Sequence, residues 1–208
     1  MESALDRKTF LNPTIEVARQ LLGQCVVRRF EDGTLCIGRI VETEAYTVGD
    51  PACHAFRGIS KANAAMFGSP GHAYIHINYG LHYCLNAVTQ AEGIPEAVLI
   101  RAIEPLENAA LMYRNYTGDI VSEDIARQEK RIGAGPGRLT KALQIDKHFD
   151  GVDLTDSESP LFLISGATVS DNEVTTTTRI GITKAADYPW RFYATASPFV
   201  SRRAIRVK

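Results

Sequence analysis

The stretch LCIGRIVETEAY (35–46) is rich in β-branched residues and is typical of a long β-strand. Four further β-rich runs lie around it in the sequence: QCVVRRF (24–30), HAYIHIN (72–78), HYCLNAV (82–88) and EAVLIRAI (96–103). The turn signals DG, SPG, YG and EGIP separate these runs. We therefore expect the five runs to form one sheet.

The rest of the chain combines helical patterns with later β-rich runs. A helix over 12–22 has Asn12 as its cap, Pro13 at its first position and Gly23 as its stop. The remaining expected elements are helices at 105–115, 122–130 and 139–145, the last after the loop GAGPGR (133–138), and strands at 161–170, 175–183 and 190–196. The chain has no repeat or linker, so residues 1–208 should form a single α+β domain with one mixed sheet and peripheral helices.

Length and composition exclude several classes of protein. Of 208 residues, 45% are hydrophobic and 23% are charged, as in globular rather than disordered or fibrous proteins. No apolar run approaches the roughly 20 residues of a membrane span, and the start MESALDRKTF does not have the pattern of a signal peptide. We therefore expect an intracellular protein without a membrane partner, in the cytoplasm or nucleoid of a bacterium or the nucleus of a eukaryote.

The charge and the cysteine content limit the kinds of ligand and metal site that we expect. The formal net charge of −1 argues against indiscriminate binding of polyanions over the whole surface. Cations nevertheless cluster between Arg127 and Lys141 and again from Arg202 onward, which fits either one anion-facing side or ordinary solvated charge. The four cysteines form no C-x-x-C pair, so a zinc or redox motif is disfavoured and reduced, mostly buried thiols are expected.

Two acids occur close together near the end of the stretch 35–46. Strand alternation places Glu42 and Glu44 on one face, together with Ile40 and Tyr46. Either the strand runs out into water and both acids are simply hydrated, or the pair belongs to a site beside an aromatic ring. Alternation alone treats the two acids alike.

The segment HINYGLHY predicts a β-hairpin with Tyr79 at its tip. A three-residue loop of residues 78–80, with Gly80 in the left-handed conformation, would pair Ile77 with Leu81. That register also places His76 and Asn86 on the same face. An aromatic side chain at a hairpin tip either packs on its own turn or forms a wedge that can enter a stack of bases.

Histidines add a further possible site. His54 follows the two acids, and His72, Tyr74 and His76 recur at every second position of the next run. Such side chains bind a metal ion or stack on a planar ligand, but no pair of them has a carboxylate close in sequence, so the metal signal is weak. The loop GAGPGR does not have the G-K-[ST] ending of an ATP loop, and its backbone amides with Arg138 are better suited to a single phosphate contact at the start of the next helix.

Several longer motifs together resemble one known family. They are GRIVETEAY, ACHAFRG, MFGSPGHAYIHINYG, CLNAV, VLIRAIEPLE, GAGPGRLTKAL and RFYATASPFVSR, and they span the chain from about Thr9 to Arg202. In this order they resemble the alkyladenine (3-methyladenine) DNA glycosylases. The resemblance implies a single mixed α+β domain with a curved, mainly antiparallel sheet. It also implies hydrolysis of the N-glycosidic bond of alkylated or deaminated purines in duplex DNA, the first step of base excision repair.

The resemblance assigns roles around the damaged base. Glu44 is the implied general base that deprotonates the attacking water, and Arg101 is the arginine beside that water. Tyr46 is an implied wall of the pocket, and His54 is the histidine that packs on the flipped nucleotide. Asn86 matches the asparagine that contacts the purine edge and disfavours the exocyclic amine of guanine.

The remaining implied residues concern the DNA. Tyr79 matches the side chain that enters the minor groove where the nucleotide has left, and the loop Arg179, Ile180 and Gly181 resembles one that lines the pocket and the DNA surface. Lys141 could act as a Schiff-base nucleophile, but a solvated lysine or one that contacts a phosphate is the better interpretation, so we expect no lyase activity. We expect damaged duplex DNA as partner, a monomer, and no metal or other cofactor.

Two positions depart from the family pattern. His76 stands where a stacking tyrosine is expected, and it offers a smaller, titratable ring to a substrate base. Ala62 stands where an arginine is expected, so a phosphate contact is missing or is made by Arg57 or Lys61. Two other functions remain as alternatives: a metal-dependent hydrolase that uses Glu44, His54 and His76, and a nucleic-acid-binding module without catalysis.

Overall fold

The computed structural model of the chain describes residues 3–78, 80–118 and 131–204. Its strands are β1 (Cys25–Arg29), β2 (Leu35–Tyr46), β3 (Ala73–Asn78), β4 (His82–Thr89), β5 (Glu96–Glu107), β6 (Leu161–Ile164), β7 (Val174–Thr177) and β8 (Arg191–Ala194). Its helices are α1 (Thr14–Gln20), α2 (Ala109–Thr117) and α4 (Pro136–Ala142), with the 3-10 turns η1 (Arg7–Leu11), η2 (Ala64–Phe67), η3 (Lys147–Phe149) and η4 (Asp171–Glu173). The expected helix at 122–130 lies outside the described residues.

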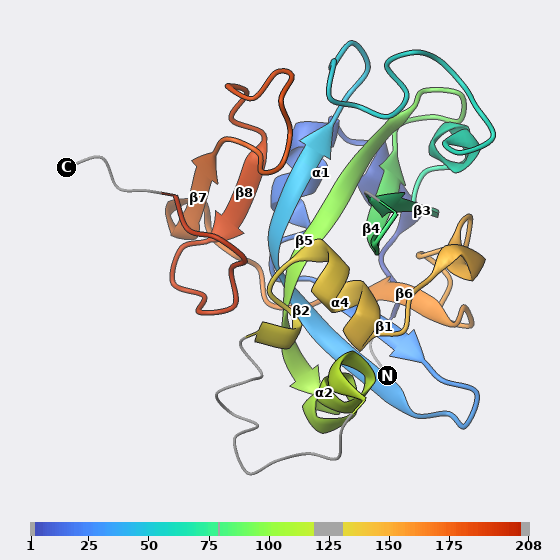
Figure 1. Cartoon of the computed structure of the whole chain (residues 1–208), viewed down its shortest axis with the longest axis vertical. Helices are drawn as coiled ribbons and strands as arrows, with labels where there is room; N and C mark the ends of the chain where they lie inside the picture. Colours follow the sequence, from blue (N-terminus) through green and yellow to red (C-terminus); the bar gives the residue numbers. More distant parts are fainter. Residues whose placement is uncertain (1–2, 79, 119–130, 205–208) are drawn as a thin grey trace.

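The described strands form one curved antiparallel sheet, as Figure 1 shows. Its order is β3-β4-β5-β2-β1-β6, and β8 pairs with both β2 and β7. Strand β2 lies at the branch point: Leu35 to Arg39 pair with β1, whereas Glu42 to Glu44 pair with β8. Helix α1 packs on β2 and β5, and α4 packs on β4 and β5. The expected α+β fold with a curved, mainly antiparallel sheet is confirmed.

The run of β2 and the four runs around it all form strands, with two corrections to the neighbouring helices. Strand β5 continues through Pro105 to Glu107, so the helix expected at 105–115 begins only at Ala109. The strand persists because β2 pairs with it as far as Glu107, and Pro105 lies beside a register shift that tolerates its missing N–H. Helix α1 is shorter than expected, and Pro13 is its cap rather than its first residue.

The late strands are shorter than the runs that predicted them. Strand β6 ends at Ile164, because the chain then passes so close to Gly23 that a Cβ on Gly166 would lie 2.1 Å from the Gly23 carbonyl oxygen. Strand β7 ends at Thr177, and the following segment turns toward the end of β2 instead of extending the sheet. That turn places residues from the far end of the chain beside Glu44.

Strand alternation is interrupted at Glu42. The pairing of β2 with β5 shifts register between Ile40 and Glu42 and again between Glu42 and Thr43. Ile40 therefore does not belong to the row of acids; it packs in the main hydrophobic cluster. The other face of β2 packs against α1, where the Thr43 hydroxyl donates to the Ala18 carbonyl over 2.6 Å. Irregular pairing of this kind re-aims side chains and is frequent next to active sites.

The hairpin of β3 and β4 differs by two positions from the expected register. Asn78 pairs with His82 and Ile77 with Tyr83, whereas the expected three-residue loop of 78–80 would have paired Ile77 with Leu81. Because the shift is even, His76 and Asn86 still lie on one face, as expected. Gly80 has the expected positive φ of 69°. Tyr79 itself lies outside the described residues.

Candidate active site

A cavity of about 460 Å³ opens between the ends of β2 and β5, the β3–β4 hairpin and the segment after β7. Seven residues singled out from the sequence line it: Tyr46, His54, His76, Asn86, Arg101, Ile180 and Gly181. Further lining residues are Ala52, Met66, Tyr74, Asn78, Cys84, Ala97, Leu99, Pro136 and Ile182. The fold thus brings together lining residues that are up to 136 positions apart in sequence, between Tyr46 and Ile182.

Glu44 is fully buried and contacts three residues of the cavity wall. Its Oε1 accepts from the Ile180 amide over 2.8 Å. Its Oε2 accepts from the Tyr46 hydroxyl over 2.9 Å and from a terminal nitrogen of Arg101 over 3.2 Å. The hydrated-acid interpretation is therefore wrong for both acids, since Glu42 and Glu44 each have 0% exposure.

Burial decides the protonation behaviour of this carboxyl group. Desolvation raises the pKa of Glu44 above its ordinary 4.5, and the charge of Arg101 with the Ile180 and Tyr46 hydrogen bonds opposes that rise. Desolvation, followed by the neighbouring Glu44 charge, also raises the pKa of Tyr46, whose hydroxyl therefore stays a donor. The arrangement combines a carboxylate of raised basicity with donors that fix its orientation.

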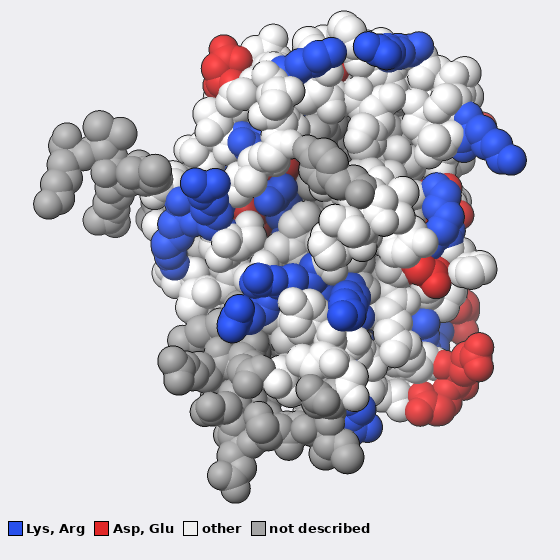
Figure 2. Space-filling model, viewed as in Figure 1, with Lys and Arg blue, Asp and Glu red and all other residues white. Residues whose placement is uncertain are grey.

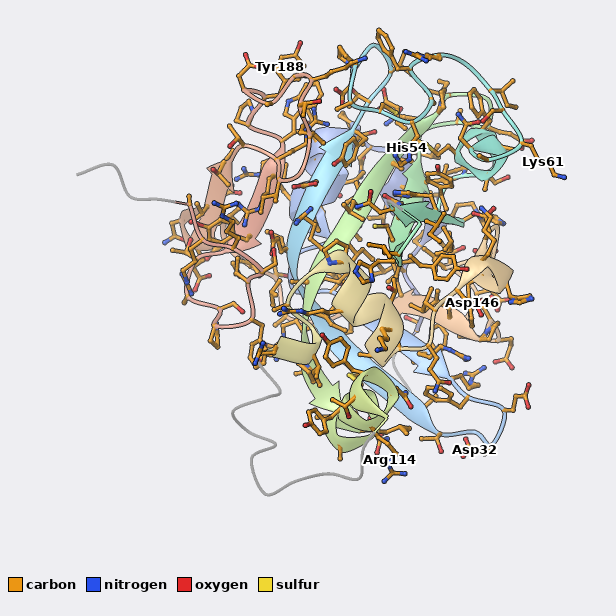
Figure 3. All side chains as sticks on the ribbon, viewed as in Figure 1. Asp32, His54, Lys61, Arg114, Asp146 and Tyr188 are labelled. Atoms are coloured by element: carbon orange, nitrogen blue, oxygen red, sulfur yellow. The ribbon has the colours of Figure 1, made fainter. Side chains whose placement is uncertain are left out.

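Aromatic and imidazole rings form one wall of the cavity. The rings of His54 and His76 meet edge-on with centroids 4.1 Å apart, and Tyr74 stacks on His76 at 5.6 Å and 23°. The Tyr74 hydroxyl lies 3.1 Å from Nδ1 of His54. Figure 3 shows His54 in the upper part of the molecule, near the ends of β2 and β5, whereas Lys61 of the following loop points outward.

Asn86 has its amide orientation fixed by the hairpin. Its Nδ2 donates to the carbonyl oxygens of Tyr74 at 3.0 Å and Cys84 at 3.3 Å, and it lies 3.4 Å from Nδ1 of His76. Because carbonyl oxygens only accept, these contacts identify the nitrogen. The side chain is buried, so it presents a defined polar group to anything that enters the cavity.

His76 supports a prediction about stability and pH. Desolvation, with smaller contributions from His54 and Lys147, lowers the pKa of His76 from 6.5 to about 3. A lowered folded-state pKa contributes stability that is present above pH 6.5 and is lost as the pH falls toward 3. From pH 7 to pH 5, the free energy of unfolding should fall by about 2 kcal/mol less in His76→Phe than in the wild type.

Urea denaturation at the two pH values measures this difference. The exposed His148 provides the control, and His148→Gln should keep the pH dependence of the wild type. If His76→Phe and the wild type lose the same amount of stability, His76 is not the titrating group.

Arg179 lies behind the cavity wall and not among the residues that line the cavity. Its guanidinium is buried and pairs with both oxygens of Asp50, one nitrogen to one oxygen at 3.0 Å and the other in a shorter contact. It also donates to the Ala45 carbonyl over 3.1 Å and stacks on the rings of Tyr46 and Trp190 at 4.6 and 5.1 Å. The side chain thus supports a cavity wall from behind, and its expected DNA contact stays a prediction.

Helix α4 connects the hairpin to two cations expected to contact DNA. Arg138 is partly exposed, and Lys141 is exposed with its ammonium 5.2 Å from the ring of Tyr116. The Thr140 hydroxyl donates to the Tyr83 carbonyl over 2.9 Å, and a Cβ on Gly137 would lie 2.6 Å from Cβ of His82. In Figure 2, Lys and Arg side chains lie on several sides of a hollow in this face, while visible acids gather mostly at the lower right.

The proposed histidine ligands do not come together with a third ligand. His72 is not among the residues that line the cavity, and its Nδ1 lies 3.1 Å from a terminal nitrogen of Arg7. Within residues 3–78, 80–118 and 131–204, no three His, Cys, Asp or Glu side chains form a group that could hold a metal ion. Each helix in the same ranges is too short or too polar to cross a membrane.

Tyr74, whose spacing from His76 already indicated a possible stacking ring, forms part of the ring wall, and both lie on one face of β3. One participant was missed from the sequence. Asp50 binds Arg179, and nothing in its local sequence distinguishes it from a loop acid. Only long-range packing identifies this partner.

Comparison with known proteins gives a consistent result. The sequence profile of the methylpurine-DNA glycosylase family matches residues 8–198. A protein of Carboxydothermus hydrogenoformans is 43% identical over 199 residues, which cover 96% of this chain and 99% of the relative. One of Methanoculleus marisnigri is 47% identical over 194 residues, or 91% and 94% of the two chains. Both relatives carry the name "Putative 3-methyladenine DNA glycosylase".

Proposed function

This chain belongs to the methylpurine-DNA glycosylase family, and we propose that it hydrolyses the N-glycosidic bond of alkylated or deaminated purines in duplex DNA. The damaged nucleotide is swung out of the duplex into the cavity, and a water molecule activated by Glu44 attacks the sugar. The single observation that carries this proposal is the buried Glu44 carboxylate, held by three residues that line one cavity.

The hydrogen-bond inventory of Glu44 supports its role toward water. A carboxylate has about four acceptor positions. Among the described residues, two donors occupy Oε2 and one, the Ile180 amide, occupies Oε1. One acceptor position of Oε1 therefore remains for a water proton. The same negative charge stabilises the oxocarbenium-like sugar that forms as the base departs.

The cavity walls suit a flipped purine. A volume of about 460 Å³ accommodates a purine nucleotide. A purine alkylated at N3 or N7 is cationic, and a facing aromatic ring attracts it by roughly 0.5 to 2 kcal/mol. Tyr46 offers such a ring, and His76 stays neutral at physiological pH, which avoids repulsion of a cationic base. We propose Asn86 and His54 as the polar groups that select among bases.

We propose that the reaction stops at base release. A lyase step requires an amine that forms a Schiff base with the sugar. The cavity lining, within the described part of the chain, contains no lysine, and Lys141 instead lies exposed on α4. The duplex would then be held by Arg138 and Lys141, with Tyr79 as the wedge. One copy of the chain supplies all these contacts, so we propose that the protein acts as a monomer.

Binding to DNA should decrease with salt. Each phosphate contact releases counterions, so a plot of log affinity against log salt has a negative slope. Lys141→Ala should reduce the magnitude of that slope by about one. Fluorescence anisotropy with a labelled duplex measures it, and Lys8→Ala in η1, which packs against α1 and β4, is the control. A flat salt profile of the wild type would contradict DNA as ligand.

One experiment tests the proposed function directly. Duplex oligonucleotides that each carry hypoxanthine, 3-methyladenine, 7-methylguanine or ethenoadenine are incubated with the protein, and abasic sites are scored by alkali cleavage. We expect base release from at least one lesion, strand breaks only after alkali, and full activity after treatment with a chelator. Loss of activity on chelation would favour a metal-dependent hydrolase, and binding without release would favour a non-catalytic module.

A further inference from the structure

Glu42 is a buried acid that the proposed reaction does not use. Like Glu44, it is fully buried and is absent from the residues that line the cavity. Unlike Glu44, it accepts from neither Tyr46 nor Ile180 of the cavity wall. Its Oε1 accepts from Nε of Arg101 at 3.1 Å, from Nε of Arg191 at 2.7 Å and from the Ser201 hydroxyl at 2.9 Å. Its Oε2 accepts from the Ser201 amide at 2.7 Å. A carboxylate with four donors in a dry site is held in one orientation.

Arg101 connects this acid to Glu44. Its Nε binds Glu42 and one terminal nitrogen binds Glu44, so the two carboxylates hold the guanidinium from two sides. The planar fork of arginine makes such a double contact geometrically restrictive. The irregular pairing of β2 with β5 occurs at these positions, because Glu42 pairs with Ala102 and the next pair joins Thr43 to Ile100. The backbone irregularity thus permits both contacts of Arg101.

The C-terminal segment closes the other side of Glu42. Ser201 supplies two of its four donors, and Arg191 of β8 supplies a third. A terminal nitrogen of Arg191 also contacts the Arg202 carbonyl, and the Tyr193 hydroxyl accepts from the Ala204 amide over 3.2 Å. Residues 201–204 are therefore attached to β8 and to Glu42 at once, although they lie 157 or more positions from Glu44 in the sequence.

We propose that Glu42 is a positioning residue for base release: it fixes Arg101 against Glu44, and the C-terminal Ser201 with Arg191 fixes Glu42. The inference rests on the proposed function of Glu44. It gives the last described residues of the chain a part in the reaction, although they line no part of the cavity. A residue with a purely structural role would stabilise the fold without affecting the proton affinity of Glu44.

The charges around Glu44 give the direction of the effect. The charged and titratable groups that face it are Glu42 and Tyr46 of β2, Arg101 of β5, Cys84 of β4 and Arg179 after β7. Glu42 raises the pKa of Glu44 by repulsion, and it also shares the positive charge of Arg101. Removal of the Glu42 charge therefore lowers the pKa of Glu44.

The test is the pH profile of single-turnover base release by Glu42→Gln, with a lesion duplex that the wild type processes. Glu44 acts as a base only when ionised, so a lower pKa moves the acid limb of the profile downward. We expect a shift of roughly one pH unit, together with an at least tenfold lower plateau, because Arg101 loses one of its two anchors. The matched control is Glu104→Gln, which removes a carboxylate that pairs with Arg39 elsewhere on the same two strands. It should leave the profile unchanged.

The outcomes separate the possibilities. An acid limb that stays in place in folded Glu42→Gln overturns the proposal, whatever the plateau. If Glu42→Gln does not fold, as judged by circular dichroism, Ser201→Ala decides instead. Without the hydroxyl donor, the negative charge of Glu42 is less compensated and repels Glu44 more strongly. The acid limb of the pH profile should therefore move upward by a few tenths of a pH unit, and an acid limb that stays in place overturns the proposal. If the wild type releases no base at all, the proposed function has failed before this step is tested.

Discussion

Glu44→Gln is expected to release damaged bases about 100- to 10,000-fold more slowly than the wild type, the range for loss of a general base. The amide of glutamine has nearly the size of the carboxylate, so the cavity keeps its shape. It has no negative charge to accept the proton of water or to stabilise the sugar cation. Single-turnover cleavage of a lesion duplex measures the rate, and anisotropy measures the binding. Binding of abasic or damaged duplex should remain.

The hydrogen bonds of Glu44 also predict a limited loss of stability in this variant. Either orientation of the new amide points its NH₂ group at a donor, either the Ile180 amide or the pair of Tyr46 and Arg101. One such conflict costs about 1 to 3 kcal/mol. Rates are therefore compared at a temperature where both proteins are folded, as checked by circular dichroism. Turnover within threefold of the wild type would remove Glu44 from the mechanism.

Asp50→Asn is expected to lower the free energy of unfolding by about 3 to 5 kcal/mol, as for other buried pairs that lose one partner. Both side chains of the Asp50–Arg179 pair are fully buried, so the variant leaves a guanidinium charge uncompensated away from water. Urea denaturation at neutral pH measures the change. The exposed Asp171, which pairs with Arg19, gives the control, and Asp171→Asn should have no measurable effect.

The same variant should weaken the cavity wall. Arg179 stacks on the ring of Tyr46, and the Tyr46 hydroxyl donates to Glu44. Asp50→Asn should therefore raise KM for the lesion duplex even at temperatures where the protein is folded. An unfolding midpoint equal to that of the wild type would show that Arg179 finds another partner. An unchanged KM in the folded variant would show that Tyr46 does not depend on the pair.

Local sequence patterns predicted the strands because they depend on neighbouring residues. Strand β2 has the expected bounds, and the turn at Gly80 has the expected positive φ. The end of β5 was not predictable in this way, since Pro105 is a poor strand residue that pairing with Gly38 keeps in the sheet. Similarly, the segment 178–183 has a β-rich composition, but the buried contacts of Arg179 draw it out of the sheet.

In the candidate site, too, the sequence predicted some features, and others depended on contacts between distant segments. Motifs in the sequence indicated Glu44, Tyr46, His54 and Asn86, but alternation could not distinguish Glu44 from Glu42. Their difference depends on which donors reach each acid: the Ile180 amide and the Tyr46 hydroxyl for one, Arg191 and Ser201 for the other. These donors come mainly from the last thirty residues of the chain, so no window around the acids contains the information.

The sequence determines the succession of strands and turns along the chain, the two acids of β2 and the membership of a glycosylase family. These features follow from periodicity and motifs, which are encoded in adjacent residues. The burial of both acids, the sharing of Arg101 and the position of Arg179 behind Tyr46 follow only from the tertiary structure. Electrostatic and hydrogen-bond energies depend on distance and desolvation in space, and the folded chain sets both by joining β2 to β5, β8 and the C-terminal segment.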